Sequence, residues 1–139
     1  MNSLSTHIDL NEIPTHGRVL VIEPAGPFEC RWGRTLGMVC NSIRRHRPDY
    51  LVIDVRELRG IRACLSVFME LPVGAASEMH RLSAERQTAL IATGENATAL
   101  NIVIPMMKLE DLLGKTVFLD MESALAAQKR RQRSTGNLT

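Results

Sequence analysis

Residues 50–66 read YLVIDVRELRGIRACLS, and the change of character along this stretch predicts the fold. The run LVIDV at 51–55 is short, apolar and mostly β-branched, which is typical of a strand buried on both faces of a sheet. Charged residues and a glycine interrupt it at 56–60, and helical apolar spacing resumes at Leu65. The stretch is therefore a strand, a loop and a helix start, and α/β proteins often place ligand or regulatory sites in such loops.

Size and composition indicate one globular domain. The chain has 139 residues, of which 45% are hydrophobic and 23% charged, enough for a substantial core. The net charge of +2 is too small to imply affinity for nucleic acid or a membrane. The basic run at 129–133 has no interleaved aromatic residues and is interpreted as a solvated helix end. We expect a single domain at 7–130 and flexible termini at 1–6 and 134–139.

The expected compartment is the cytoplasm. The N-terminal sequence has no basic region followed by an apolar stretch, and the apolar runs are too short to cross a bilayer. The chain has three cysteines, an odd number, and no CxxC spacing, which argues against a disulfide framework or a zinc site. Cys40 lies on a helical apolar stripe and is expected to pack in the core.

Hydrophobic periodicity and turn residues predict alternating strands and helices after an N-terminal hairpin. The sequence PAGP at 24–27 is expected to end the second strand, and Pro72 to kink or divide the helix that contains it. Asp120 is a suitable N-cap for a last helix. The predicted elements are strands at 7–12 and 18–23, a helix around 32–43, a strand at 51–55, a helix at 63–82, a strand at 88–93, a helix within 97–113, a strand at 116–119 and a helix at 121–132.

Motifs that would indicate catalysis or cofactor binding are missing from the sequence. It contains no Gly-rich phosphate loop, no GxSxG and no HExxH, and its four histidines, interpreted as solvated, have no metal-ligand spacing. We therefore predict no catalytic residue, no cofactor and no metal. Two roles stay open for Cys64, a reactive thiol at a helix start or a structural residue. Two also stay open for Asp54, a catalytic carboxylate or a group that orients the following loop.

Three stretches and the element order resemble the STAS domain of anti-anti-sigma factors. They are RVLVIEPAGPF at 18–28, VIDVRELRGI at 52–61 and LLGKTVFLDMESAL at 112–125, and the resemblance covers about 7–130. It implies an α/β fold of order ββαβαβαβα, with a mixed, mostly parallel sheet of about five strands and helices packed on it. Glu29 falls where the family commonly has an Asp near its nucleotide and partner surface.

The sequence departs from this family at the switch motif, Asp-Ser-Ser/Thr-Gly, whose first Ser accepts phosphate. The corresponding residues are Arg62, Ala63, Cys64 and Leu65, and Ala63 has no hydroxyl to phosphorylate. Ser66 lies further along the predicted helix and is a poor substitute. Arg59 and Arg62 are candidates for holding an anion at this helix start, and a free surface role is the alternative.

The resemblance implies a non-enzymatic, regulatory interaction module that has lost its phosphoswitch. Its expected partner is an anti-sigma or kinase-like protein, or a scaffold component, and a homodimer through the edge of the first strand is a further arrangement. The second hypothesis is a domain that binds a small apolar ligand beneath helices interrupted by Pro72 and Pro105, and the third is an enzyme of unknown class. The candidate partner-binding residues are Glu29, Asp54, Arg56, Glu57, Arg59, Arg62, Ala63, Cys64 and Ser66.

Overall fold

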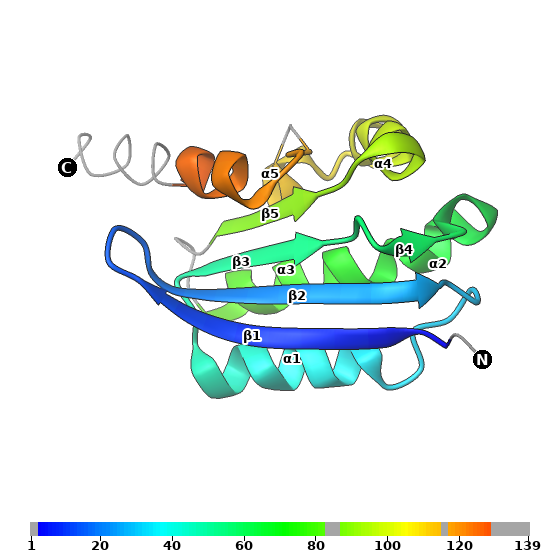
Figure 1. Ribbon diagram of the computed structural model, residues 1–139. Coiled ribbons are helices and arrows are strands. Elements are labelled where there is room, and N and C mark those ends of the chain that lie inside the picture. Colours follow the sequence, from blue (N-terminus) through cyan, green and yellow to red (C-terminus); the bar gives the residue numbers. More distant parts are fainter. Residues whose placement is uncertain (1–2, 83–86, 115–116, 129–139) are drawn as a thin grey trace.

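The computed structural model describes residues 3–82, 87–114 and 117–128 (Figure 1). The strands are β1 (Ser5–Ile13), β2 (Gly17–Pro27), β3 (Tyr50–Asp54), β4 (Leu58–Arg59) and β5 (Gln87–Ile91). The helices are α1 (Thr35–His46), the 3₁₀ helix η1 (Ile61–Cys64), α2 (Leu65–Phe68), α3 (Glu70–Leu82), α4 (Gly94–Met106) and α5 (Glu110–Leu113), and residues 121–128 form a further helix.

The described strands form one mixed, mostly parallel sheet of five strands. Its order is β1-β2-β3-β5, and β4 pairs with the end of β2. The hairpin of β1 and β2 is antiparallel, whereas β2 pairs in parallel with β3 and β4, and β3 in parallel with β5. The predicted α/β fold and its N-terminal hairpin are thereby confirmed.

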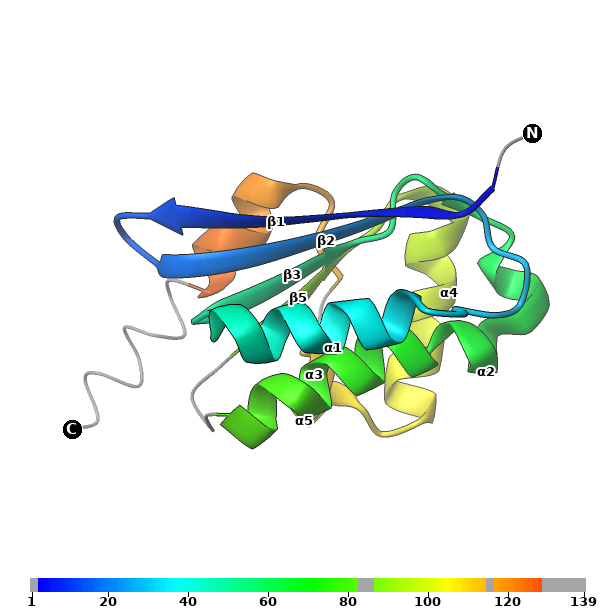
Figure 2. The same cartoon turned by 90° about the horizontal axis from the view of Figure 1, so that it is seen from below.

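Side-chain alternation in the central strands gives the sheet two buried faces. Leu20, Ile22, Leu51 and Ile53 point to the face covered by α1 and α3, which lie in front of the sheet in Figure 2. The residues between them contact the helix at 121–128 on the opposite face, where Ala124 is buried. Because every residue of β3 is buried, the prediction of a strand covered on both faces is correct.

The prediction that residues 24–27 end the second strand is wrong, because β2 continues to Pro27 and pairs with β4. The amides of Gly26 and Phe28 donate to the carbonyls of Glu57 (3.0 Å) and Arg59 (2.8 Å), so the missing N–H of Pro27 leaves this ladder intact. Gly26 has φ +104°, and a Cβ there would lie 2.8 Å from the Ser3 carbonyl oxygen. Only glycine suits this position.

Two helix boundaries also differ from the sequence prediction. The helix predicted over 63–82 divides into η1, α2 and α3, with the break at Met69 rather than at Pro72. Pro72 lies in the first turn of α3, where a missing N–H costs no intrahelical hydrogen bond. The helix predicted around 32–43 begins at Thr35, so Trp32 and the left-handed Gly33 (φ +55°) precede it.

Both ends of the described chain differ from the prediction. The N-terminal end has more strand than predicted, and the C-terminal end has less. Ser5 and Thr6, predicted to be flexible, pair with Ala25 and Pro24 in the hairpin. The strand predicted at 116–119 is only a parallel bridge between Ile91 and Phe118. Asp120 caps the following helix by accepting a hydrogen bond from the Ser123 amide at 2.8 Å, as predicted. The predicted helix end at 132 and the terminus at 134–139 lie outside the described residues.

The sequence analysis expected His16 to be solvated, but its side chain is buried. Its Nε2–H donates to the Leu125 carbonyl oxygen at 2.6 Å, and Nδ1 is 2.8 Å from the Thr15 hydroxyl oxygen. The imidazole also meets the Tyr50 ring edge-on, with ring centroids 5.5 Å apart. One side chain therefore links the hairpin turn, the start of β3 and the C-terminal helix.

Replacing His16 tests this link. His16→Ala removes the hydrogen bond to the Leu125 carbonyl and the packing of the buried ring, so we expect the free energy of unfolding to fall by about 1–3 kcal/mol. Chemical denaturation measures the loss, and amide exchange should rise mostly within 121–128. His80→Ala, at an exposed position of α3, is the control, and equal stability of the two variants would contradict the role given to His16.

Candidate partner-binding site

The loops that follow β2 and β3 lie side by side at the carboxyl ends of the parallel strands, on the right in Figure 1. We call residues 26–34 and 57–66 the loop surface. The pairing of β4 with Gly26 and Pro27 joins the two segments through their backbones. The loop surface is thus an extension of the sheet, and it includes the end of β2, β4, η1 and the start of α2.

Trp32 anchors the first segment in the core. Its ring is buried between Phe28 and Phe68, with centroids 4.8 Å and 5.7 Å away. The indole Nε1–H donates to the carbonyl oxygens of Val67 and Phe68, both at 3.1 Å. Since Trp32 and Phe28 flank the exposed residues of this loop, the loop is held at both ends against α2.

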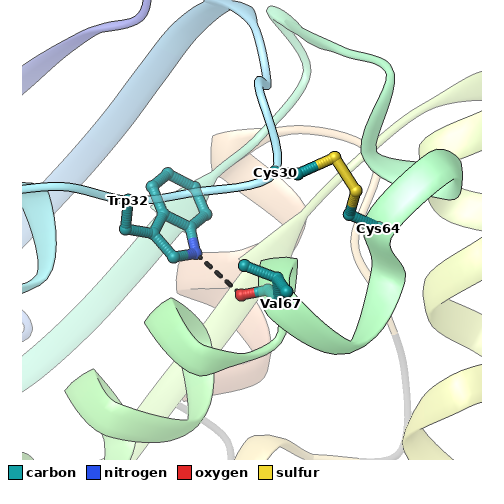
Figure 3. Close-up of a disulfide and its surroundings, with 4 residues drawn as sticks. All are labelled: Cys30, Trp32, Cys64 and Val67. Atoms are coloured by element: carbon teal, nitrogen blue, oxygen red, sulfur yellow. Dashed lines mark hydrogen bonds between the residues drawn. A yellow bond between two sulfur atoms is a disulfide. The ribbon is translucent and has the colours of Figure 1, made fainter.

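A disulfide between Cys30 and Cys64 connects the two segments of the loop surface (Figure 3). The Cα atoms are 5.3 Å apart, within the range that a disulfide requires. The expectation of no disulfide is therefore wrong. An odd number of cysteines requires only that one remain unpaired, and that residue is the half-buried Cys40. Burial, with help from the nearby Glu78 carboxylate, raises the pKa of the Cys40 thiol.

The charged side chains of the loop surface make only weak contacts within the chain. Glu29 lies 3.9 Å from Arg31, and Arg62 lies 3.9 Å from Glu95 of α4, with all four side chains at least 60% exposed. Exposed pairs of this kind contribute little to stability, so they can exchange for contacts with a partner. Among the other predicted site residues, Glu57, Arg59, Ala63 and Ser66 are also exposed on this surface.

Asp54 and Arg56 form a separate ion pair. The Asp54 carboxylate is 8% exposed, and Arg56 contacts it through Nε at 3.0 Å and a terminal nitrogen at 2.7 Å. The hydrogen bond to Asp54 is the main reason that the pKa of Arg56 is raised, and the charges of Asp120 and Glu23 raise it further. Asp120 caps the helix at 121–128, on the second face of the sheet, so the structure separates this pair from Cys64 and Trp32.

Asn96 is a structural residue of this region that the sequence analysis missed. Its side-chain amide donates to the carbonyl oxygens of Val55 (2.9 Å) and Leu58 (3.0 Å) and so fixes the loop after β3 to the start of α4. These partners lie 41 and 38 positions away in the sequence. No local pattern reveals an amide whose partners are backbone carbonyls at such a distance.

A hollow in the surface of the protein lies away from the helices predicted to cover a small ligand. An open hollow of about 340 Å³ is lined by Glu12, Ile13, Pro14, Gly17 and Arg18 at the hairpin turn. The helices around Pro72 and Pro105 do not contribute to that lining. Within 3–82, 87–114 and 117–128, no helix is long and apolar enough to span a membrane, and no cluster of His, Cys, Asp and Glu could hold a metal ion.

Comparison with known proteins agrees with the arrangement of strands and helices. No protein-family model and no curated protein matches the chain significantly. The crystal structure of an anti-sigma factor antagonist from Mycobacterium paratuberculosis matches with a TM-score of 0.58 and 18% identity, over 90% of this chain and 95% of that chain. The likeness establishes the fold over nearly the whole chain.

We expect the ion pair of Asp54 and Arg56 to stabilise the fold measurably. Arg56→Ala leaves a nearly buried carboxylate without its cation, and we expect a loss of about 1–3 kcal/mol, reduced by the partial exposure of Arg56. Adding Asp54→Asn should recover part of this loss, and denaturation of both single variants and the double variant gives the coupling energy. Strictly additive losses would mean that the pair does not hold the loop.

Proposed function

We propose that this protein is a non-enzymatic interaction module that acts like an anti-sigma factor antagonist and binds a protein partner through the loop surface. The observation that carries the proposal is that the charged side chains of the loop surface are exposed, while the backbone beneath them is held by contacts to the core. Trp32, Asn96 and the Cys30–Cys64 disulfide hold the backbone, while the charged groups remain exposed. Such preorganisation lowers the entropy cost of binding a protein.

The charge of the loop surface suggests the chemistry of its partner. Arg31, Arg34, Arg59 and Arg62 are exposed there, against Glu29 and Glu57, which leaves a positive excess. A partner of the anti-sigma or kinase-like type, or a scaffold component, would present an acidic face to this surface, and such complementarity favours rapid and specific association. The proposed compartment for this encounter is the cytoplasm.

The absence of a hydroxyl at position 63 supports a partner contact that phosphorylation does not control. Ala63 is exposed in η1, at the position that resembles the family's phosphate acceptor. The methyl side chain of Ala63 can contact a partner by packing alone, because it has no charge and no hydroxyl that could accept phosphate. The module would therefore bind constitutively with respect to that modification.

A capture experiment with charge-reversed variants tests the proposal. Tagged wild type is expected to capture an anti-sigma or kinase-like protein from an extract of its native cell, and Arg59→Glu with Arg62→Glu should abolish the capture. Arg45→Glu with Arg47→Glu at the far end of α1 changes the net charge equally and should have no effect. Loss of capture in both variants would indicate a non-specific charge effect.

The same experiment addresses the small-ligand hypothesis. If the wild type captures no protein and native mass spectrometry finds a bound apolar molecule, a ligand carrier replaces the interaction module and the loop surface is not its site. The exposed apolar side chains of Ile102 and Met106 on α4 would then be the first residues to examine.

Substitution of Ala63 tests the centre of the loop surface with little change to the fold. Ala63→Glu places bulk and negative charge against an acidic partner, and we expect its affinity to fall about tenfold or more. Ala63→Ser should keep the affinity, because the position is exposed. Ala126→Glu, at an exposed position of the helix at 121–128, is the matched control. Calorimetry with the captured partner measures all three, and unchanged binding of Ala63→Glu would exclude η1 from the interface.

A further inference from the structure

The Cys30–Cys64 disulfide joins the two segments of the loop surface across a sequence separation of 34 residues. Cys30 is exposed at the tip of the first segment and has φ +60°, a left-handed conformation that is uncommon for residues other than glycine. Cys64 is partly buried at the end of η1. Cys30 is thus the more exposed of the two cysteines, and it lies beside the residues proposed to contact a partner.

The frame beneath the disulfide is held by other interactions. Phe28 donates its amide to Arg59 (2.8 Å), Trp32 packs between two aromatic rings, and Asn96 secures the loop after β3. None of these contacts involves a sulfur atom. Opening the disulfide would therefore release residues 29–31 and η1 locally, and the sheet and helices would remain folded.

We propose that Cys30 and Cys64 form a reversible thiol–disulfide switch that controls the shape of the loop surface and, through it, partner binding. The effect on binding rests on the proposed function, whereas the switch itself does not. In the oxidised state, η1 and the loop after β2 are held together in one conformation. In the reduced state, the two segments move independently, and binding carries the entropy cost of ordering them. Exposed disulfides in reducing compartments are typically of this labile, regulatory kind.

The chemistry of the switch is thiol–disulfide exchange with a dithiol reductant. A thiolate of the reductant attacks the sulfur of Cys30, the more exposed cysteine, the Cys30–Cys64 bond breaks, and Cys64 leaves as a thiolate that takes up a proton. The second thiolate of the reductant attacks the mixed disulfide and releases Cys30, which is also protonated. The protein gains two electrons and two protons, and the reductant becomes a disulfide.

Thiol counting and hydrogen exchange test the switch without any partner. The protein is equilibrated in buffers of reduced and oxidised glutathione and alkylated under native and denaturing conditions. Mass spectrometry then gives the number of alkylated thiols. We expect one thiol in the oxidised form, assigned to Cys40, and three in the reduced form. Amide exchange at 29–33 and 61–66 should accelerate about tenfold or more on reduction, while β3 and β5 stay protected.

Trp32 supplies an independent optical signal. It is the single tryptophan of the chain, its indole donates a hydrogen bond to Val67 as Figure 3 shows, and it lies close to the disulfide in sequence. Its fluorescence should follow the alkylation state through the glutathione titration. Cys30→Ser and Cys64→Ser should each show the reduced exchange pattern in every buffer, and Cys40→Ser should switch like the wild type.

Two results would overturn the switch: three free thiols in every glutathione buffer, or equal exchange at 29–33 and 61–66 in both states. Binding of the captured partner to the oxidised and reduced proteins then tests whether the switch controls binding. Tighter binding to the oxidised protein supports control of binding, and equal binding in both states rejects it while leaving the interaction module intact. A switch that works in a protein that captures no partner would count against the proposed function alone.

Discussion

The structure depends on burying β3 on both faces at once. Its five residues are all buried, so each of its two sets of side chains needs its own apolar cover. Helices α1 and α3 supply one cover and the helix at 121–128 supplies the other. The loops at the carboxyl ends of β2 and β3 are neighbours because these two strands pair in parallel and so end at the same edge of the sheet. The loop surface is therefore a consequence of the parallel pairing of β2 with β3 and with β4.

The fold could be predicted from the sequence because most of its helices and strands follow from the spacing of apolar residues close together in the chain. The β-branched run at 51–55 and the alternation in the hairpin depend only on neighbouring residues, and the structural match to an anti-sigma factor antagonist agrees with them. The features that were missed depend on contacts distant in sequence. Strand β4 is two residues long and is defined only by its pairing with β2. Likewise, the Cys30–Cys64 bond and the burial of His16 against Leu125 require the folded chain.

Proximity in the sequence also misled the prediction of the site. Asp54 and Arg56 are close to Arg59 and Arg62 along the chain, but alternation in β3 turns Asp54 toward the same face as Tyr50 and Val52. Arg56 follows the Asp54 carboxylate there, beside the charges of Glu23 and Asp120. The residues at 59–66 lie beyond that strand, and β4 and η1 determine which way their side chains point. A candidate site drawn from one stretch of sequence therefore divides into a structural pair and an exposed surface.

The contrast between the hairpin and the parallel strands has a consequence for the order of folding. In β1 and β2, Ile13 pairs with Gly17, so their pairing closes only a very short loop. The register of β2 with β3 joins Val19 to Tyr50, and that of β3 with β5 joins Tyr50 to Gln87, so each closes a much longer one. Loop-closure entropy favours the hairpin as an early template onto which the parallel strands assemble. We therefore expect destabilising changes in the hairpin to slow folding, and changes around β5 mainly to speed unfolding.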